Sequence, residues 1–290
     1  MVTTLHKLLD TARRRSFAIP AFNVTDLETV QAVLDAAVQM RSPVIIQTSE
    51  KAMSYAGART LYALMRVAAE DRARKIPVVI HLDHGKHFAV VSQAVRLGYT
   101  SVHMDASEKP WARNVALTKR AVALGHRHGI TVQGELGYLL GYEGMTKIRF
   151  TKRAIEKYLT VPLRAAEFVR KTGVDTLAVA VGTAHGVFKG KEFIDVPRLR
   201  AIARATRVPL VLHGGSGLSA RNLKTAIRNG VRIVNIDTWL RLAFMKGLSA
   251  SVKRRKPSHV DIREPLGAAR LTMMQEAIRV IRLLGSAGKA

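Results

Sequence analysis

Eight short β-rich segments alternate with helical patterns along this chain, and they limit its fold more than any other feature. These segments are 18–23, 43–49, 77–83, 100–105, 131–135, 176–181, 208–213 and 231–236. Strands that alternate with helices pair in parallel through right-handed crossovers, and eight such units close into a barrel. The 290 residues are therefore predicted to form one α/β domain, a (β/α)8 TIM barrel over residues 1–290. An open doubly wound sheet is the alternative, but no GxGxxG motif follows the first strand.

Two helices are predicted near the N-terminus. A short amphipathic helix, rather than a transit peptide, is indicated by the helical spacing of Leu5, Leu8, Leu9 and Ala12. A second helix is predicted over 27–40, where Thr25 and Glu28 have the spacing of a capping box. Its apolar face is expected to comprise Leu27, Val30, Leu34, Ala37 and Val38.

The interval 137–175 has no strand candidate. It contains a polar, glycine-bearing stretch and then a helix that begins at about Pro162. We expect an insertion loop after the fifth strand that acts as a mobile lid, and a further helix at the C-terminal end of the chain.

Composition limits the kinds of site that the chain can build. It has no cysteine, so any metal must be held by His, Asp or Glu. The formal net charge of +26 would attract phosphorylated metabolites, nucleic acid or acidic lipid. The basic residues are scattered through helices, which favours a solvated basic surface and makes nucleic acid the weaker candidate. No apolar run reaches the roughly 18 residues that a membrane helix needs. We therefore expect a cytoplasmic protein that does not bind membranes.

Polar side chains gather where the predicted strands end. In barrels of this kind the active site lies at the carboxyl ends of the strands. Ten residues hold such positions: Asn23, Ser49, Asp83, His84, Asp105, Glu135, His185, His213, Asn235 and Asp237.

Three of these strand ends carry histidine. Catalytic zinc takes three protein ligands and leaves one position open, which predicts a zinc site at His84, His185 and His213. Asp83 could be a general acid or base, or else the N-cap of the next helix. Asp105 and Glu135 could hold a second cation or orient the histidines. His81 and His103 lie inside strands, and we interpret them as buried structural residues.

Glycine-bearing turns follow the sixth and seventh strands, at 182-GTAHG-186 and 213-HGGSG-217. Their backbone N–H groups could bind phosphate, as could the helix that follows 235-NIDT-238. The alternative is that these glycines only permit tight turns. A hydrolase nucleophile is disfavoured because Leu218 stands where GxSxG requires glycine. None of the eight strands carries a lysine for a Schiff base.

Together these motifs resemble the class II, zinc-dependent ketose-bisphosphate aldolases. The resemblance covers nearly the whole chain through 21-AFNV-24, 81-HLDHG-85, 99-YTSVHMDAS-107, 135-ELG-137, 176-TLAVAVGTAHG-186, 208-VPLVLHGGSG-217 and 235-NIDT-238. It implies reversible aldol cleavage of a ketose 1,6-bisphosphate, first of all fructose 1,6-bisphosphate, to dihydroxyacetone phosphate and glyceraldehyde 3-phosphate. It also implies a homodimer or homotetramer.

The resemblance implies roles for individual residues. The catalytic Zn2+ would be bound by His84, His185 and His213, and a second divalent cation by Asp105 and Glu135, with Na+ or K+ near the phosphate. Asp83 would be the acid/base at the aldehyde-derived oxygen, and Glu143 would move the proton at C1. Substrate would be bound by Asn23, Ser49, Gly186, Gly214, Gly215, Ser216, Asn235, Ile236, Asp237, Thr238 and Arg282. Arg282 would reach the second phosphate of the substrate, in this family often across a subunit contact.

Two segments depart from the family pattern. Gln133 replaces an acid in 132-VQGELG-137, and Leu140 and Gly144 are substituted in the lid segment 140-LGYEG-144. Three other functions stay open: a tagatose 1,6-bisphosphate aldolase, an isomerase or epimerase with the same chemistry, and a basic binding protein with an altered lid.

Overall fold

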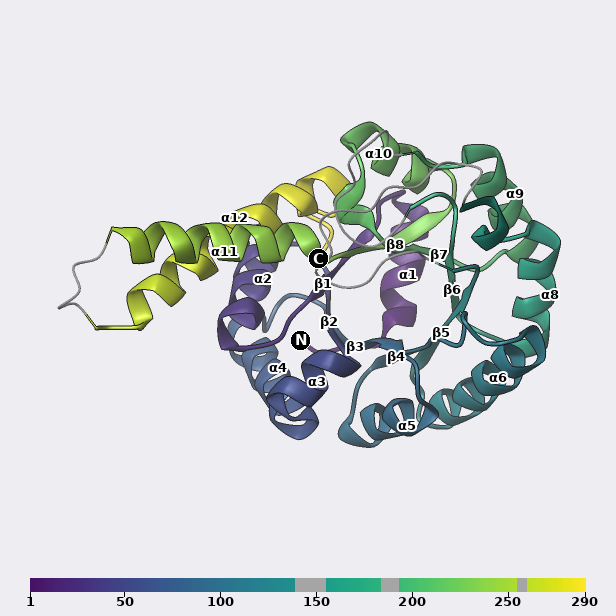
Figure 1. Ribbon diagram of the computed structural model, residues 1–290, viewed down its shortest axis with the longest axis horizontal. Coiled ribbons are helices and arrows are strands. Elements are labelled where there is room, and N and C mark those ends of the chain that lie inside the picture. The colour runs from purple at the N-terminus through teal and green to yellow at the C-terminus, as the bar shows by residue number, and fades with distance from the viewer. Residues whose placement is uncertain (139–154, 184–192, 255–259) are drawn as a thin grey trace.

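The computed structural model describes residues 1–138, 155–183, 193–254 and 260–290. Eight parallel strands close into a barrel in chain order, β1 to β8, with β8 paired to β1 (Figure 1). Their bounds are β1 Ile19–Asn23, β2 Val44–Ser49, β3 Val78–Gly85, β4 Ser101–Met104, β5 Thr131–Leu136, β6 Thr176–Val179, β7 Leu210–Leu212 and β8 Val231–Ile236. The (β/α)8 TIM barrel predicted from the sequence is confirmed.

The helices lie around the barrel wall or, for α1, across one end of it. They are α1 Leu5–Arg14, α2 Leu27–Gln39, α3 Glu50–Ala56, α4 Ala58–Arg72, α5 Phe88–Leu97, α6 Trp111–Arg127, α8 Pro162–Thr172, α9 Val196–Thr206, α10 Ala220–Arg228, α11 Thr238–Lys253 and α12 Arg263–Leu284, with short 3-10 turns η1 Glu156–Tyr158 and η2 Gly215–Gly217. The helices α11 and α12 pack along each other and project beyond the barrel wall (Figure 1). None of the helices in the described ranges is long and apolar enough to cross a lipid bilayer.

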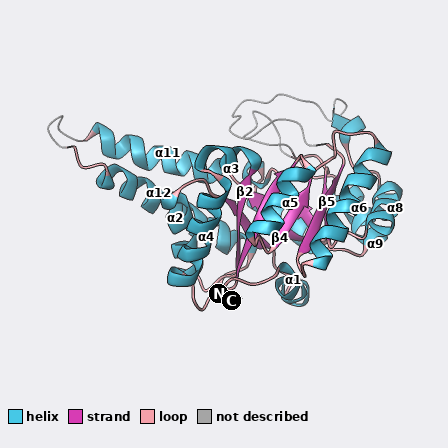
Figure 2. Cartoon of the chain, turned by 90° about the horizontal axis from the view of Figure 1, so that it is seen from below, coloured by secondary structure: helices cyan, strands magenta, loops and turns pink. Residues whose placement is uncertain are grey.

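Helix α1 closes the amino-terminal end of the barrel. Its apolar face, with the spacing predicted from the sequence, is buried through Leu5, Leu8, Leu9 and Ala12. These side chains form one cluster with residues inside the barrel, Ile19, Ala21, Ile45, Val79, Ala178, Val211 and Ile233. The helix lies below the strands, on the side opposite the carboxyl ends of the strands (Figure 2). The barrel interior is therefore apolar and sealed at one end.

The interior becomes polar toward the other end. Successive inward positions of a strand are two residues apart, so Ile19 and Ala21 are followed by Asn23. The same change occurs on β3, where buried Val79 is followed by His81 and Asp83. The strand pattern thus places the apolar residues at the closed end and the polar residues at the mouth.

The start of α2 differs from the sequence prediction. Asp26, not Thr25, is the N-cap, and its side chain accepts a hydrogen bond from the backbone of Thr29 at 2.8 Å. The capping box pairs Asp26 with Thr29 because the helix begins at Leu27, one residue later than the predicted motif requires. The predicted apolar face is also only partly buried, since Leu27 is 44% exposed and Val38 is 38% exposed.

We expect Phe168→Ala to destabilise the fold by about 3–5 kcal/mol, because it would leave a cavity in the core. Phe168 is fully buried on α8 and packs edge-on against Trp111, with ring centroids 5.9 Å apart. Urea unfolding measures the loss. Leu163→Ala, on the same helix but 81% exposed, should change stability by no more than about 0.5 kcal/mol. Equal losses in the two variants would contradict this account of the core.

Candidate metal centre

A bulge near the end of β3 shapes the mouth of the barrel. The pairing with β4 shifts between Leu82 and Gly85, and His84 has a φ of 48°, in the left-handed region. Residues that follow each other in a regular strand point to opposite faces. The bulge lets consecutive side chains serve the same site, and Asp83 Oδ1 lies 4.0 Å from His84 Nε2. Gly85 is required here, because a Cβ would lie 2.6 Å from the backbone oxygen of His103.

Side-chain amides from three strands hold the carboxylate of Asp83. Asn23 and Gln47 donate to its Oδ2 at 2.9 and 3.2 Å, and Asn235 donates to its Oδ1 at 3.1 Å. Gln47 also donates to Asn23 Oδ1 at 2.8 Å, which fixes the orientation of the Asn23 amide. The carboxylate is only 4% exposed. Such hydrogen bonds favour the ionised form and fix its direction, as a general base requires.

His84 and His213 face each other beside this carboxylate. Their ring centroids are 4.5 Å apart, and ligand atoms of Asp83, His84 and His213 all lie within 4.8 Å of one another. The Nδ1 of His84 donates to Asp105 Oδ2 at 2.7 Å, which leaves Nε2 on the side of His213 and Asp83. A carboxylate bound to the far nitrogen of a histidine is the usual way in which proteins orient a metal ligand.

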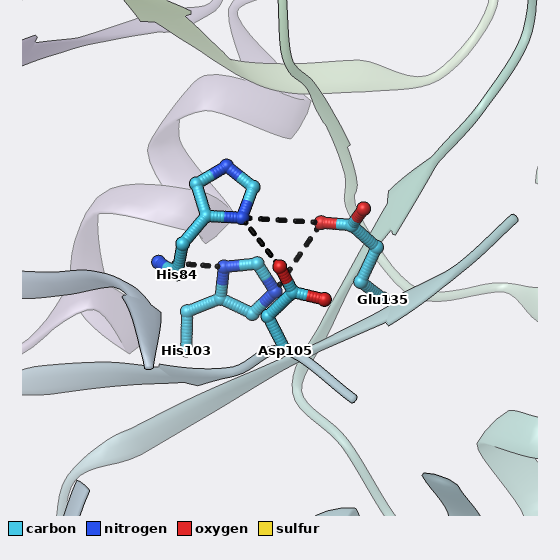
Figure 3. Close-up of side chains that lie close together, drawn as sticks. All are labelled: His84, His103, Asp105 and Glu135. Atoms are coloured by element: carbon cyan, nitrogen blue, oxygen red, sulfur yellow. Dashed lines mark hydrogen bonds and ion pairs between the residues drawn. The ribbon is translucent and has the colours of Figure 1, made fainter. Parts of the chain in front are cut away.

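A second group of ligand atoms lies behind His84. It comprises His84, His103, Asp105 and Glu135 (Figure 3). Glu135 Oε2 lies 3.8 Å from His84 Nδ1 and 3.5 Å from His103 Nε2. Within the described residues, Glu135 Oε2 and His103 Nε2 are buried and make no hydrogen bond. Asp105 is held further by Ser107, whose hydroxyl donates to Oδ1 at 2.7 Å.

Burial and charge shift the protonation of these groups. Burial by itself lowers the pKa of His84, but the charges of Asp83, Asp105 and Glu135 and the hydrogen bond to Asp105 outweigh it, so the pKa rises to about 10. Burial raises the pKa of Glu135 well above its ordinary value, and the charge of Asp105 adds to the effect. For Asp105, the hydrogen bond and charge of His84 overcome burial and hold its pKa well below the usual range.

The donors at the mouth suit a divalent cation. Imidazole nitrogens and carboxylate oxygens are ordinary zinc ligands, and Glu135 Oε2 is a buried acceptor with no hydrogen bond among the described residues. Two of the three predicted zinc ligands, His84 and His213, are brought together. The third, His185, lies outside the described residues, as do Gly186, Glu143 and the departures Leu140 and Gly144.

The turn after β7 lies close to the end of β8. Gly214 is left-handed, with a φ of 70°, and begins η2. A Cβ on Gly215 would lie 2.5 Å from Val234 Cγ1 and 3.0 Å from the backbone oxygen of Asn235, so only glycine fits. The hydroxyl of Ser216 accepts from the backbone of Trp239 in the first turn of α11 at 3.3 Å. Together with Ile236, Asp237 and Thr238, the turn forms one rim segment beside a helix N-terminus.

Two predicted substrate-binding residues lie elsewhere or have another contact. Ser49 is the N-cap of α3 and accepts from the backbone of Ala52 at 3.3 Å. Arg282 is exposed in the last turn of α12. In the same turn the backbone carbonyl of Leu284 accepts a hydrogen bond from the backbone N–H of Ala18, just before β1. That is the amino-terminal end of the barrel, so Arg282 does not lie at the mouth of its own barrel. Its expected role across a subunit contact stays a prediction.

Sequence reasoning missed three residues that touch the site. Gln47 binds Asp83, Gln133 lies 3.2 Å from His213 Nε2, and His103 contacts both His84 and Glu135. His103 was predicted to be buried, and it is, with 0% exposure. The available signal was the two-residue period of a strand: Gln47, His103 and Gln133 each stand two positions before a rim residue.

Comparisons with known proteins identify similar sequences. The sequence model of a family described as "Fructose-bisphosphate aldolase class-II" matches residues 3–289. A fructose-bisphosphate aldolase of Thermus caldophilus is 39% identical over 313 residues and is covered completely, as is this chain.

Solved structures are similar as well. The YdjI aldolase of Escherichia coli K12 is 32% identical with a TM-score of 0.87, and the match covers 100% of both chains. A fructose-bisphosphate aldolase of Campylobacter jejuni is 24% identical with a TM-score of 0.82, covering 100% of this chain and 97% of that one. The latter supports the fold alone.

We expect the metal-free protein to lose stability as the pH rises from 6.5 to about 10. The pKa of His84 is raised in the folded state, so its contribution is complete below the ordinary value of 6.5 and is lost through about 10. Urea unfolding in EDTA across this range measures the slope. His84→Asn should flatten it, since asparagine tolerates a positive φ. Identical slopes in the wild type and in His84→Asn would contradict the assignment.

Proposed function

Since the chain belongs to the class-II fructose-bisphosphate aldolase family and is an aldolase of the lyase class, we propose that it cleaves fructose 1,6-bisphosphate reversibly with the help of Zn2+. The products are dihydroxyacetone phosphate and glyceraldehyde 3-phosphate. The observation that carries this proposal is the juxtaposition of a carboxylate held by three amides with two facing imidazoles at the barrel mouth.

The ion would be held by His84 and His213, and by His185 as the resemblance implies. When bound, zinc would supply a Lewis acid that polarises the ketone of the substrate and stabilises the developing negative charge. The hydrogen bond from His84 Nδ1 to Asp105 keeps the Nε2 lone pair directed at the mouth. Glu135 and Asp105 are the candidates for a second divalent cation.

Asp83 would handle the proton at the aldehyde-derived oxygen. In cleavage its carboxylate removes the hydroxyl proton at C4 as the bond between C3 and C4 breaks, and in condensation it returns that proton. The amides of Asn23, Gln47 and Asn235 prevent the carboxylate from turning toward other partners. Glu143 would move the proton at C1 of dihydroxyacetone phosphate, the carbon that was C3 of the sugar, an assignment that comes from the resemblance.

The rim segment after β7 and β8 would bind the phosphate of the dihydroxyacetone half. Gly214 and Gly215 allow the backbone to approach an anion closely, and the N-terminus of α11 adds a favourable dipole. Na+ or K+ near this phosphate, the homodimer or homotetramer, and a cytoplasmic location remain predictions. Light scattering of the purified protein measures the assembly state.

A coupled assay tests the reaction directly. Triose phosphates released from fructose 1,6-bisphosphate are reduced with NADH in the presence of triosephosphate isomerase and glycerol-3-phosphate dehydrogenase. We expect turnover with zinc, loss of turnover in EDTA and its return when zinc is added back, because the cation carries the Lewis-acid role. The same assay on tagatose 1,6-bisphosphate decides the preference at C4. A cleavage rate that is unchanged in EDTA would contradict the metal-dependent mechanism.

We expect Asp83→Asn to lower kcat by about 10²–10⁴-fold, the usual range for a general acid or base. The shape of the side chain is kept and its proton affinity is lost, so zinc content by mass spectrometry should stay close to that of the wild type. Asp35→Asn is a control, because Asp35 pairs with Arg72 on the outer helices. A wild-type kcat in Asp83→Asn would assign the proton transfer to another residue.

A further inference from the structure

His103 is a completely buried histidine that contacts two residues of the site. It lies on β4, two residues before Asp105, so both side chains point into the barrel. Its Nδ1 accepts a hydrogen bond from the backbone N–H of His84 at 3.2 Å. On the other side of the ring, Nε2 lies 3.5 Å from Glu135 Oε2 (Figure 3).

The first contact replaces a bond that the sheet cannot provide. In the pairing of β3 with β4, Leu82 is opposite Val102 and Gly85 is opposite Met104, so β3 has one extra residue across this interval. The bulge places His84 at a φ of 48° and takes its N–H out of the strand ladder. A buried N–H without a partner is costly, and the His103 ring supplies the acceptor.

The same contact defines which nitrogen of His103 carries the proton. A neutral imidazole has one acceptor nitrogen and one donor nitrogen. Because Nδ1 accepts from His84, the proton is on Nε2, which lies 3.5 Å from Glu135 Oε2 without a hydrogen bond to it. An Nε2 that carries a proton has no lone pair to give to a cation. His103 is therefore near the ligand atoms of the second group but is not disposed to bind metal itself.

We propose that His103 is a positioning residue that holds the backbone of His84 in its left-handed conformation and so keeps the His84 ring directed at the metal site. The proposal rests on the function proposed above, because it assumes that His84 is a metal ligand. The ring of His103 is fully buried, with Nδ1 facing the bulge.

Three substitutions separate this role from others. In His103→Asn the side-chain oxygen replaces Nδ1 and can still accept from His84, although the reach to Glu135 is lost. His103→Gln extends toward Glu135 but has no acceptor at the position of Nδ1. His103→Leu removes both contacts. The readouts are the zinc dissociation constant, measured by competition with a chelator, and hydrogen exchange of the peptide around residues 82–85 in the metal-free protein.

We expect His103→Gln and His103→Leu to bind zinc roughly 10–100-fold more weakly, the usual cost of losing a partner that orients a ligand. The amide of His84 should exchange faster in both. The zinc affinity of His103→Asn should stay within about threefold of the wild type, because the residue orients His84 and does not itself coordinate the metal. Val102→Ala, which removes buried volume from the same strand outside the site, should lower Tm and leave zinc affinity unchanged.

Two results would overturn the proposal. One is wild-type zinc affinity and exchange in all three variants. The other is a loss in His103→Asn as large as that in His103→Leu, as expected for a direct ligand. If His103→Leu does not fold, the comparison of His103→Asn with His103→Gln still decides. Hydrogen exchange needs neither zinc nor substrate, so a wild-type protein that fails to bind zinc or cleave sugar would count against the proposed function and not against the backbone contact.

Discussion

Closure of eight parallel strands into one barrel is the constraint on which the rest of the structure depends. Because there is no sheet edge, every inward side chain at the carboxyl ends of the strands must share one small space. Asp83, His84, Asp105, Glu135 and His213 come from four different strand ends or turns and still meet within hydrogen-bond or ligand distance. The bulge at His84 brings two consecutive residues of β3 into the site.

Burying these carboxyl and imidazole groups together has an electrostatic cost, and protonation of some of the groups lowers that cost. Carboxyl groups and imidazoles that are removed from water must be paired or change their charge. Without a metal ion, the proton of His84 is held by the surrounding carboxylates, and burial favours the protonated form of Glu135, so the pKa of each group is raised. A divalent cation would take over this compensation, so its binding would release protons. Metal affinity and the stability of the mouth are therefore linked through the same residues.

Much of the fold could be predicted from the sequence, because strand and helix periods are local. The eight strands, the apolar face of α1 and the start of α8 at Pro162 lie where the patterns indicated. The capping box of α2 could not be fixed, since Thr25 and Asp26 are both good caps one position apart. Arg282 lies in the last helix, as expected, but its predicted role depends on a contact between subunits, which the pattern of one chain does not describe.

The site was predictable to the extent that it follows from strand ends. The meeting of His84 with His213 was expected from topology alone, and the structure agrees. The contribution of His103 was not, because it depends on a register shift between two strands that no single segment encodes. Gln47 was not predicted at the site, and Gln133 was noted only as a departure from the family pattern. The reason is related: an amide gives no sign in the sequence of what it will bind, and both side chains contact residues on other strands.

Helix α1 covers the amino-terminal end of the barrel, so the interior opens toward the carboxyl ends of the strands. Since its leucines fill the lower interior, water, ions and small molecules have no route through the cylinder and must enter and leave at the mouth. Substitutions that weaken or improve the packing of this apolar cluster would change the stability of the closed end without contacting the polar groups at the mouth. Substitutions at the closed end would thus change the stability of the barrel, and substitutions at the mouth would change which ligand binds. Each kind of substitution would have little effect on the other property.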